Sequence, residues 1–117
     1  MIRAILYKTA DNRNTLCGFN VTNHGDSILC AAVSMLCINT ANSLETLTES
    51  ELETAYDPEG GYLECILPGI ISGNNEPEAA VLLLSLELGL KSALESYGGG
   101  KKGISIEYQE KYQEKHK

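Results

Sequence analysis

The sequence predicts an α+β fold, a mainly antiparallel sheet with two helices packed on it, in the chain order ββαββαβ. Two observations support this prediction. Strand-like segments occur in two pairs, and each pair is joined by a short turn, as in antiparallel hairpins. Two longer segments carry apolar residues at helical spacing and separate the strand pairs from each other and from a last strand. With 117 residues the chain has room for one core, so we expect a single domain over residues 1–117.

The first strand pair is expected at residues 1–9 and 15–22, with a polar turn between them. In the first of these strands Ile2, Ala4 and Leu6 share one face, because side chains alternate across a strand. This face is the better candidate for the core.

The first helix is expected to begin after Ser27 and to run to about Thr40 or somewhat beyond. Its residues are apolar nearly all round, which is typical of a helix buried in the centre of a domain. Side-chain oxygens of Asp26 and Ser27 can cap its first turn, and this places Cys30 in that turn. Ser34 follows one turn later and could hydrogen-bond near the sulfur, although a helical serine more often bonds its own backbone.

The second strand pair is expected at residues 51–56 and 62–67. The sequence between them, DPEGG, is a strong turn signal. Residues 68–75 contain two glycines and paired asparagines. We therefore expect a mobile loop there, which borders a substrate groove.

The second helix is expected to begin at Pro77, a residue suited to the first helical position, and to end before the glycines at 98–100. A last strand is expected at residues 103–108, followed by a charged, solvated tail at 109–117. The apolar residues of the second helix recur at helical spacing and predict a core stripe: Ala79, Leu83, Leu86, Leu90, Ala93, Leu94 and Tyr97.

The chain is acidic, since 9 Lys and Arg against 16 Asp and Glu give a formal net charge of −7 at pH 7. Binding to nucleic-acid phosphates needs a basic face, so we expect no direct nucleic-acid partner. The charge suits a basic protein or peptide partner. We expect no signal peptide and no transmembrane segment, and hence no membrane partner and a cytoplasmic location.

Four cysteines occur, at positions 17, 30, 37 and 65. They form no C-x-x-C pair and no tight cluster with histidine, so we expect no metal site. In a cytoplasmic protein they would be reduced thiols. Cys37 and Cys65 are expected to be core residues, as free cysteines usually are.

Cys30 has two interpretations from the residues alone. It could be one more core thiol, with His24 an ordinary loop histidine. Alternatively, a thiol in the first turn of a helix, six residues after a histidine, can become a nucleophile. A helix N-terminus stabilises an anion by only about 0.3 to 1 kcal/mol, so the imidazole would have the larger effect on the thiol.

The sequence around these residues resembles a known family signature. GFNVTNHG at 18–25, followed by DSILCAAVS at 26–34, is similar to the signature of the ribosomal-processing cysteine protease family, Prp. The chain departs from that pattern at Asn23, Gly25 and Ser27, and its loop between the histidine and the cysteine is shorter.

This resemblance implies a cytoplasmic cysteine endopeptidase that removes the N-terminal extension of a bacterial large-subunit ribosomal protein. Cys30 would be the nucleophile and His24 the base and acid, in a homodimer that needs no metal or organic cofactor. Two alternatives stay open. One is a non-catalytic binding module, associated with the ribosome or its assembly, that keeps the same fold. The other is a thiol hydrolase that acts on another substrate.

Overall fold

The computed structural model describes residues 1–23, 27–99 and 103–112. It confirms the predicted α+β fold and the predicted chain order, and it adds one short helix. The elements are β1 (Ile2–Thr9), β2 (Leu16–Thr22), α1 (Ser27–Leu47), β3 (Glu53–Tyr56), β4 (Tyr62–Ile66), α2 (Pro68–Ile71), α3 (Pro77–Tyr97) and β5 (Ile104–Lys111).

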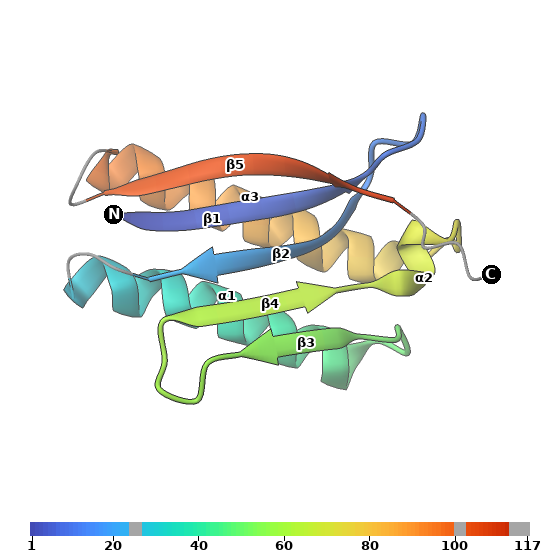
Figure 1. Cartoon of the computed structure of the whole chain (residues 1–117), viewed down its shortest axis with the longest axis horizontal. Helices are drawn as coiled ribbons and strands as arrows, with labels where there is room; N and C mark the ends of the chain where they lie inside the picture. The colour runs from blue at the N-terminus through green and yellow to red at the C-terminus, as the bar shows by residue number, and fades with distance from the viewer. Residues whose placement is uncertain (24–26, 100–102, 113–117) are drawn as a thin grey trace.

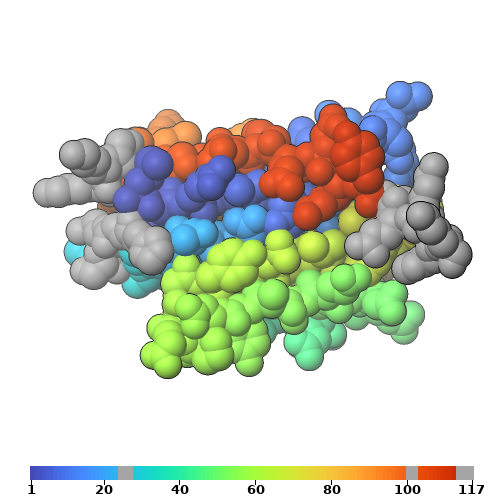
Figure 2. All heavy atoms as spheres, viewed as in Figure 1, coloured from blue at the N-terminus to red at the C-terminus, as the bar shows by residue number. Residues whose placement is uncertain are grey.

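The five strands form one sheet in the order β3-β4-β2-β1-β5 (Figure 1). The pairs β1–β2, β2–β4 and β3–β4 are antiparallel, whereas β1 and β5 pair in parallel. The helices α1 and α3 both lie behind the sheet in Figure 1. In the part of the chain that the structure describes, no long helix crosses the opposite face, which Figure 2 shows with the strands side by side.

The hydrophobic core lies between the sheet and the two long helices. The predicted face of β1 is confirmed, since Ile2, Ala4 and Leu6 are each at most 1% exposed. On the helix side, Leu83 and Leu90 of α3 are buried to the same degree. The alternation of strand side chains and the periodicity of α3 therefore direct their apolar faces toward each other.

The apolar stripe predicted on α3 is buried at Ala79, Leu83, Leu86 and Leu90, but its residues at the end of the helix are exposed. Leu94 and Tyr97 are 36% and 55% exposed. Periodicity determines which face of a helix is apolar, but burial also requires another element opposite that face.

The helix α1 ends at Leu47 and so continues well past Thr40. The polar residues after Thr40 suggested a fraying end. Instead, the Thr40 hydroxyl donates to the Leu36 carbonyl, four residues earlier, and the apolar side chain of Leu44 is fully buried. Burial of Leu44 stabilises the helical conformation of this polar segment.

The prediction that α1 is buried all round is wrong. Met35 and Ile38 are 66% and 47% exposed, so α1 lies on the sheet with one face open. Residues Ile28–Leu47 are long and apolar enough to cross a membrane, by length and composition alone. A helix that covers the core of a folded domain passes the same test, and α1 packs closely on α3, where a Cβ on Gly89 would lie 3.1 Å from the Leu36 side chain.

Residues 68–75, predicted as a loop, begin with the one-turn helix α2 (Pro68–Ile71). Ile70 is 2% exposed and anchors this turn to the core. The Arg13 guanidinium donates to the carbonyl oxygens of Ile70 and Ile71 at 2.7 and 3.2 Å. The last carbonyl groups of a helix have no N–H partner within that helix. Arg13, which is distant in sequence, provides hydrogen-bond donors to these carbonyls at the end of α2.

The last strand is longer than predicted. β5 extends to Lys111, since it pairs with the whole of β1, up to Thr9. The polar residues 109–111, expected in a solvated tail, are therefore part of the sheet. Pairing with β1 satisfies main-chain groups on one side of this edge strand, whether or not its side chains are polar.

We expect Leu83→Ala to lower the free energy of unfolding by about 2 to 5 kcal/mol, because it removes most of a fully buried side chain. The matched control is Leu84→Ala, at the neighbouring position that is 54% exposed, where the expected change is within about 0.5 kcal/mol. Urea denaturation measures both. Equal losses at the two positions would show that the buried face of α3 is wrongly assigned.

Candidate active site

The candidate active site lies where β2 ends and α1 begins, at one end of the sheet (Figure 1). Cys30 is the fourth residue of α1 and so lies in its first turn, as predicted. The main-chain N–H of Asn23, directly after β2, donates to the Gly61 carbonyl at 2.9 Å. This bond holds the end of β2 against the turn between β3 and β4.

The four cysteines are free thiols that differ in burial. Cys17, Cys37 and Cys65 are at most 1% exposed, which confirms the core positions predicted for the last two. Burial raises the pKa of Cys17 and Cys65 to about 11 and that of Cys37 to about 12. Cys30 is partly exposed and packs against the edge of the core. It is therefore the cysteine that a substrate can reach.

We expect Cys30 to react with iodoacetamide much faster than the other three cysteines in the native protein. The thiolate is the reactive form, and the raised pKa of each buried thiol leaves little thiolate near neutral pH. Peptide mass spectrometry after timed labelling gives the rate at each site, with urea-unfolded protein as the control. Equal native rates at all four sites, or none at Cys30, would contradict a catalytic thiol.

The predicted partner of Cys30, His24, lies outside the described residues, and so do Asp26 and the second histidine, His116. The pairing of His24 with Cys30 stays a prediction. The described residues on either side of this segment are Asn23, at the end of β2, and Ser27, which begins α1.

The structure shows a contact near Cys30 that the sequence did not predict. The Nδ2 group of Asn23 donates to the Ser34 hydroxyl oxygen at 2.7 Å. Ser34 follows Cys30 by four residues, so the two lie on neighbouring turns of one helix face. The other amide atom, Asn23 Oδ1, is buried and has no hydrogen-bond partner in the described part of the chain. The sequence did contain one signal for this contact, because the amide of Asn23 comes directly before the candidate catalytic residue His24.

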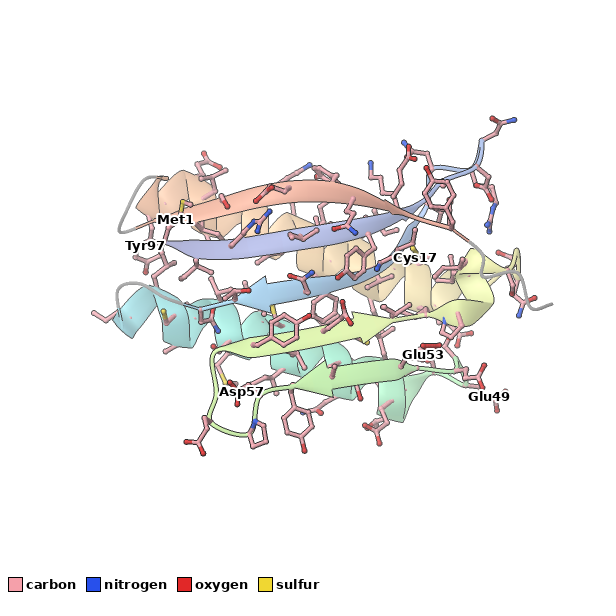
Figure 3. The ribbon with its side chains drawn as sticks, in the orientation of Figure 1. Met1, Cys17, Glu49, Glu53, Asp57 and Tyr97 are labelled. Carbon is pink, nitrogen blue, oxygen red and sulfur yellow. The ribbon has the colours of Figure 1, made fainter. Side chains whose placement is uncertain are left out.

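A cavity of about 610 Å³ lies far from Cys30, around Thr48 and the start of α3. Glu49, which lines it, lies at the opposite end of the molecule from Met1 and Tyr97 (Figure 3), and α1 begins near those two residues. At about 1.5 Å per residue, α1 separates this cavity from Cys30 by about 25 Å.

The segment 68–75 borders this cavity, since Gly69 and Asn74 line it. That the segment borders a substrate groove stays a prediction. The lining is acidic, but among the described residues no group of three or more His, Cys, Asp or Glu side chains is placed to hold a metal ion.

Solved structures share this fold. Two are of the essential ribosomal processing protease Prp from Staphylococcus aureus, one with a covalently linked product peptide and one with a substrate peptide. They match with TM-scores of 0.77 and 0.76 at 21% and 20% identity, over 93% of this chain and 100% of theirs. A protein from Streptococcus mutans matches with a TM-score of 0.72 at 22% identity, over 95% of this chain and 99% of its own.

The sequence itself matches a family model. No curated protein sequence matches the chain. The model described as cysteine protease Prp, however, matches residues 1–100, which include β2, the whole of α1 and Cys30. On this match the chain belongs to the Prp family and is a cysteine protease.

Proposed function

We propose that this protease is a cytoplasmic endopeptidase that removes the N-terminal extension of a bacterial large-subunit ribosomal protein. The observation that carries the proposal is the position of Cys30, a partly exposed thiol in the first turn of α1, in a chain of a cysteine protease family. The substrate class is supported by the similar Prp structures, which are described as a ribosomal processing protease bound to peptides.

In the proposed reaction His24 takes the Cys30 thiol proton, and the sulfur attacks the carbonyl carbon of the scissile peptide bond. The C–N bond breaks as His24 gives its proton to the leaving amine. The N-terminal part of the substrate then remains on Cys30 as a thioester. Water, giving a proton to His24, attacks the thioester carbonyl, and the departing sulfur recovers that proton.

The start of α1 supports both charged species of this reaction. The positive end of a helix dipole stabilises the thiolate before attack and the oxyanion that forms during attack. We assign the oxyanion to main-chain N–H groups in this region. An extended peptide laid across the start of α1 would bring its carbonyl to both the sulfur and these groups.

The net charge of −7 supports a basic substrate. Opposite charges on enzyme and precursor would speed their encounter, and the rate would fall as salt is added. Local contacts beside Cys30 would then select the cleavage site.

The test is a cleavage assay with purified protein and the extended ribosomal precursor of its own organism. We expect one cut, at the junction of extension and mature protein, identified by the masses of the two products. A precursor that lacks the residues on either side of the junction is the control and should stay intact. Binding without any cleavage would instead favour the non-catalytic binding module.

We also propose that the protein is a homodimer. The exposed side chains of Met35 and Ile38 form an apolar area on the outer face of α1, and such areas often mark association surfaces. Sedimentation should show twice the chain mass. A monomer at micromolar concentration would contradict the dimer and leave the proposed reaction unaffected.

A further inference from the structure

We propose that Asn23 is a positioning residue that acts on Cys30 through Ser34. Asn23 Nδ2 donates to the Ser34 hydroxyl oxygen at 2.7 Å, so this oxygen acts as an acceptor toward Asn23. Its own proton is then free to be donated elsewhere, and we assign it to the Cys30 sulfur on the preceding turn of α1. The inference rests on the proposed function, in which Cys30 reacts as a thiolate.

The position of Ser34 in α1 brings its hydroxyl to the turn that holds Cys30. Side chains four residues apart on a helix are neighbours. In addition, helical side chains lean toward the N-terminus, so Ser34 covers the turn before its own. A hydroxyl that donates to a thiolate stabilises the charged form of the sulfur.

Asn23 is itself held from two sides. Its main-chain N–H donates to the Gly61 carbonyl at 2.9 Å, and its amide donates to Ser34. These two bonds join the end of β2, the turn before β4 and the helix α1. Because Asn23 is fixed in this way, it can hold the Ser34 hydroxyl in one orientation.

The other end of the amide indicates that this residue does more than stabilise the fold. Asn23 Oδ1 is buried without a hydrogen-bond partner among the described residues. Native proteins keep few such atoms, because a buried carbonyl oxygen without a partner is unfavourable. An apolar side chain would avoid that penalty, whereas only a polar one can orient Ser34.

The test measures how fast iodoacetamide alkylates Cys30 in the folded protein as a function of pH. For Asn23→Ala we expect roughly 3- to 10-fold slower labelling of Cys30 at pH 7. The plot of labelling rate against pH should also move to higher pH, because the hydrogen bond from the Ser34 hydroxyl to the thiolate is lost. Ser34→Ala should have the same effect. The double variant should be no slower than either single variant, because the two residues act as one unit.

Two conservative substitutions separate orientation of the hydroxyl from simple packing. Ser34→Thr keeps the hydroxyl and should retain most of the wild-type rate. Asn23→Asp keeps the shape of the side chain, but a carboxylate can only accept hydrogen bonds. It should therefore draw the Ser34 hydroxyl proton away from Cys30 and add a negative charge. We therefore expect Asn23→Asp to be labelled at least as slowly as Asn23→Ala.

Matched controls come from the same two elements. Asn20→Ala removes an amide that donates to the Tyr7 hydroxyl, three residues earlier in β2. Thr40→Val removes a hydroxyl from α1 that donates to the Leu36 carbonyl. Both should leave Cys30 labelling unchanged. Wild-type labelling in folded Asn23→Ala, additive losses in the double variant, or equal losses in the controls would overturn the inference.

Turnover then distinguishes this inference from the proposed function. If the wild type cleaves the precursor, Asn23→Ala should lower kcat by a similar factor and change KM little, since the thiolate is needed for chemistry. If the wild type cleaves nothing, the proposed function fails. Alkylation needs no substrate, so it still tests Asn23. If Asn23→Ala does not fold, the pair Ser34→Ala and Ser34→Thr decides the result.

Discussion

Cys30→Ala is expected to abolish cleavage of the ribosomal precursor, with a loss of at least about 10³-fold in kcat. No other cysteine can replace it as nucleophile, because Cys17, Cys37 and Cys65 are buried in the core. Removal of the nucleophile from a protease typically costs several orders of magnitude in kcat. Alanine is the best helix former, so α1 should keep its first turn.

The measurement is the rate of product formation, followed by mass spectrometry with enzyme in excess. The circular dichroism spectrum and thermal midpoint of the variant show that it is folded. Cys65→Ala is the matched control. It removes a buried thiol of β4 at some cost in stability and should leave kcat near the wild-type value. Undiminished cleavage by folded Cys30→Ala would refute the mechanism.

His24→Ala is expected to lower kcat by about 10² to 10⁴-fold, because general acid–base catalysis contributes about that factor. KM should change much less, since the proposed role of His24 is proton transfer and stabilisation of the thiolate. Steady-state kinetics with a peptide that spans the cleavage junction separates the two constants.

The other histidine of the chain provides the control for this variant. His116 is near the C-terminus, in the charged segment predicted to be solvated, so His116→Ala should retain wild-type kinetics. A similar loss in both variants would argue against a specific role for His24. A large rise in KM with kcat unchanged would make His24 a binding residue and leave Cys30 without its proposed base.

The features predicted correctly from the sequence depend on residues close together in the chain. Alternation in β1 identified Ile2, Ala4 and Leu6 as the core face, and all three are buried. The signals around Ser27 predicted where α1 begins, and they placed Cys30 in its first turn. Both results follow from local geometry, in which the side-chain period of a strand or helix decides which residues share a face.

The features that the sequence did not predict depend on partners distant in the chain. The length of α1 depends on burial of Leu44, and the length of β5 depends on parallel pairing with β1. Similarly, the exposure of Met35 and Ile38 reflects the absence of a covering element among the described residues.

At the site, the sequence by itself determined the family and the position of Cys30 in the first turn of α1, because a helix start, a cysteine and the residues around them form one continuous motif. Only the tertiary structure showed that Asn23 binds Ser34. These residues are eleven positions apart and belong to different elements. Their contact exists because β2 and α1 pack against one core, and no local pattern encodes the distance between two packed elements.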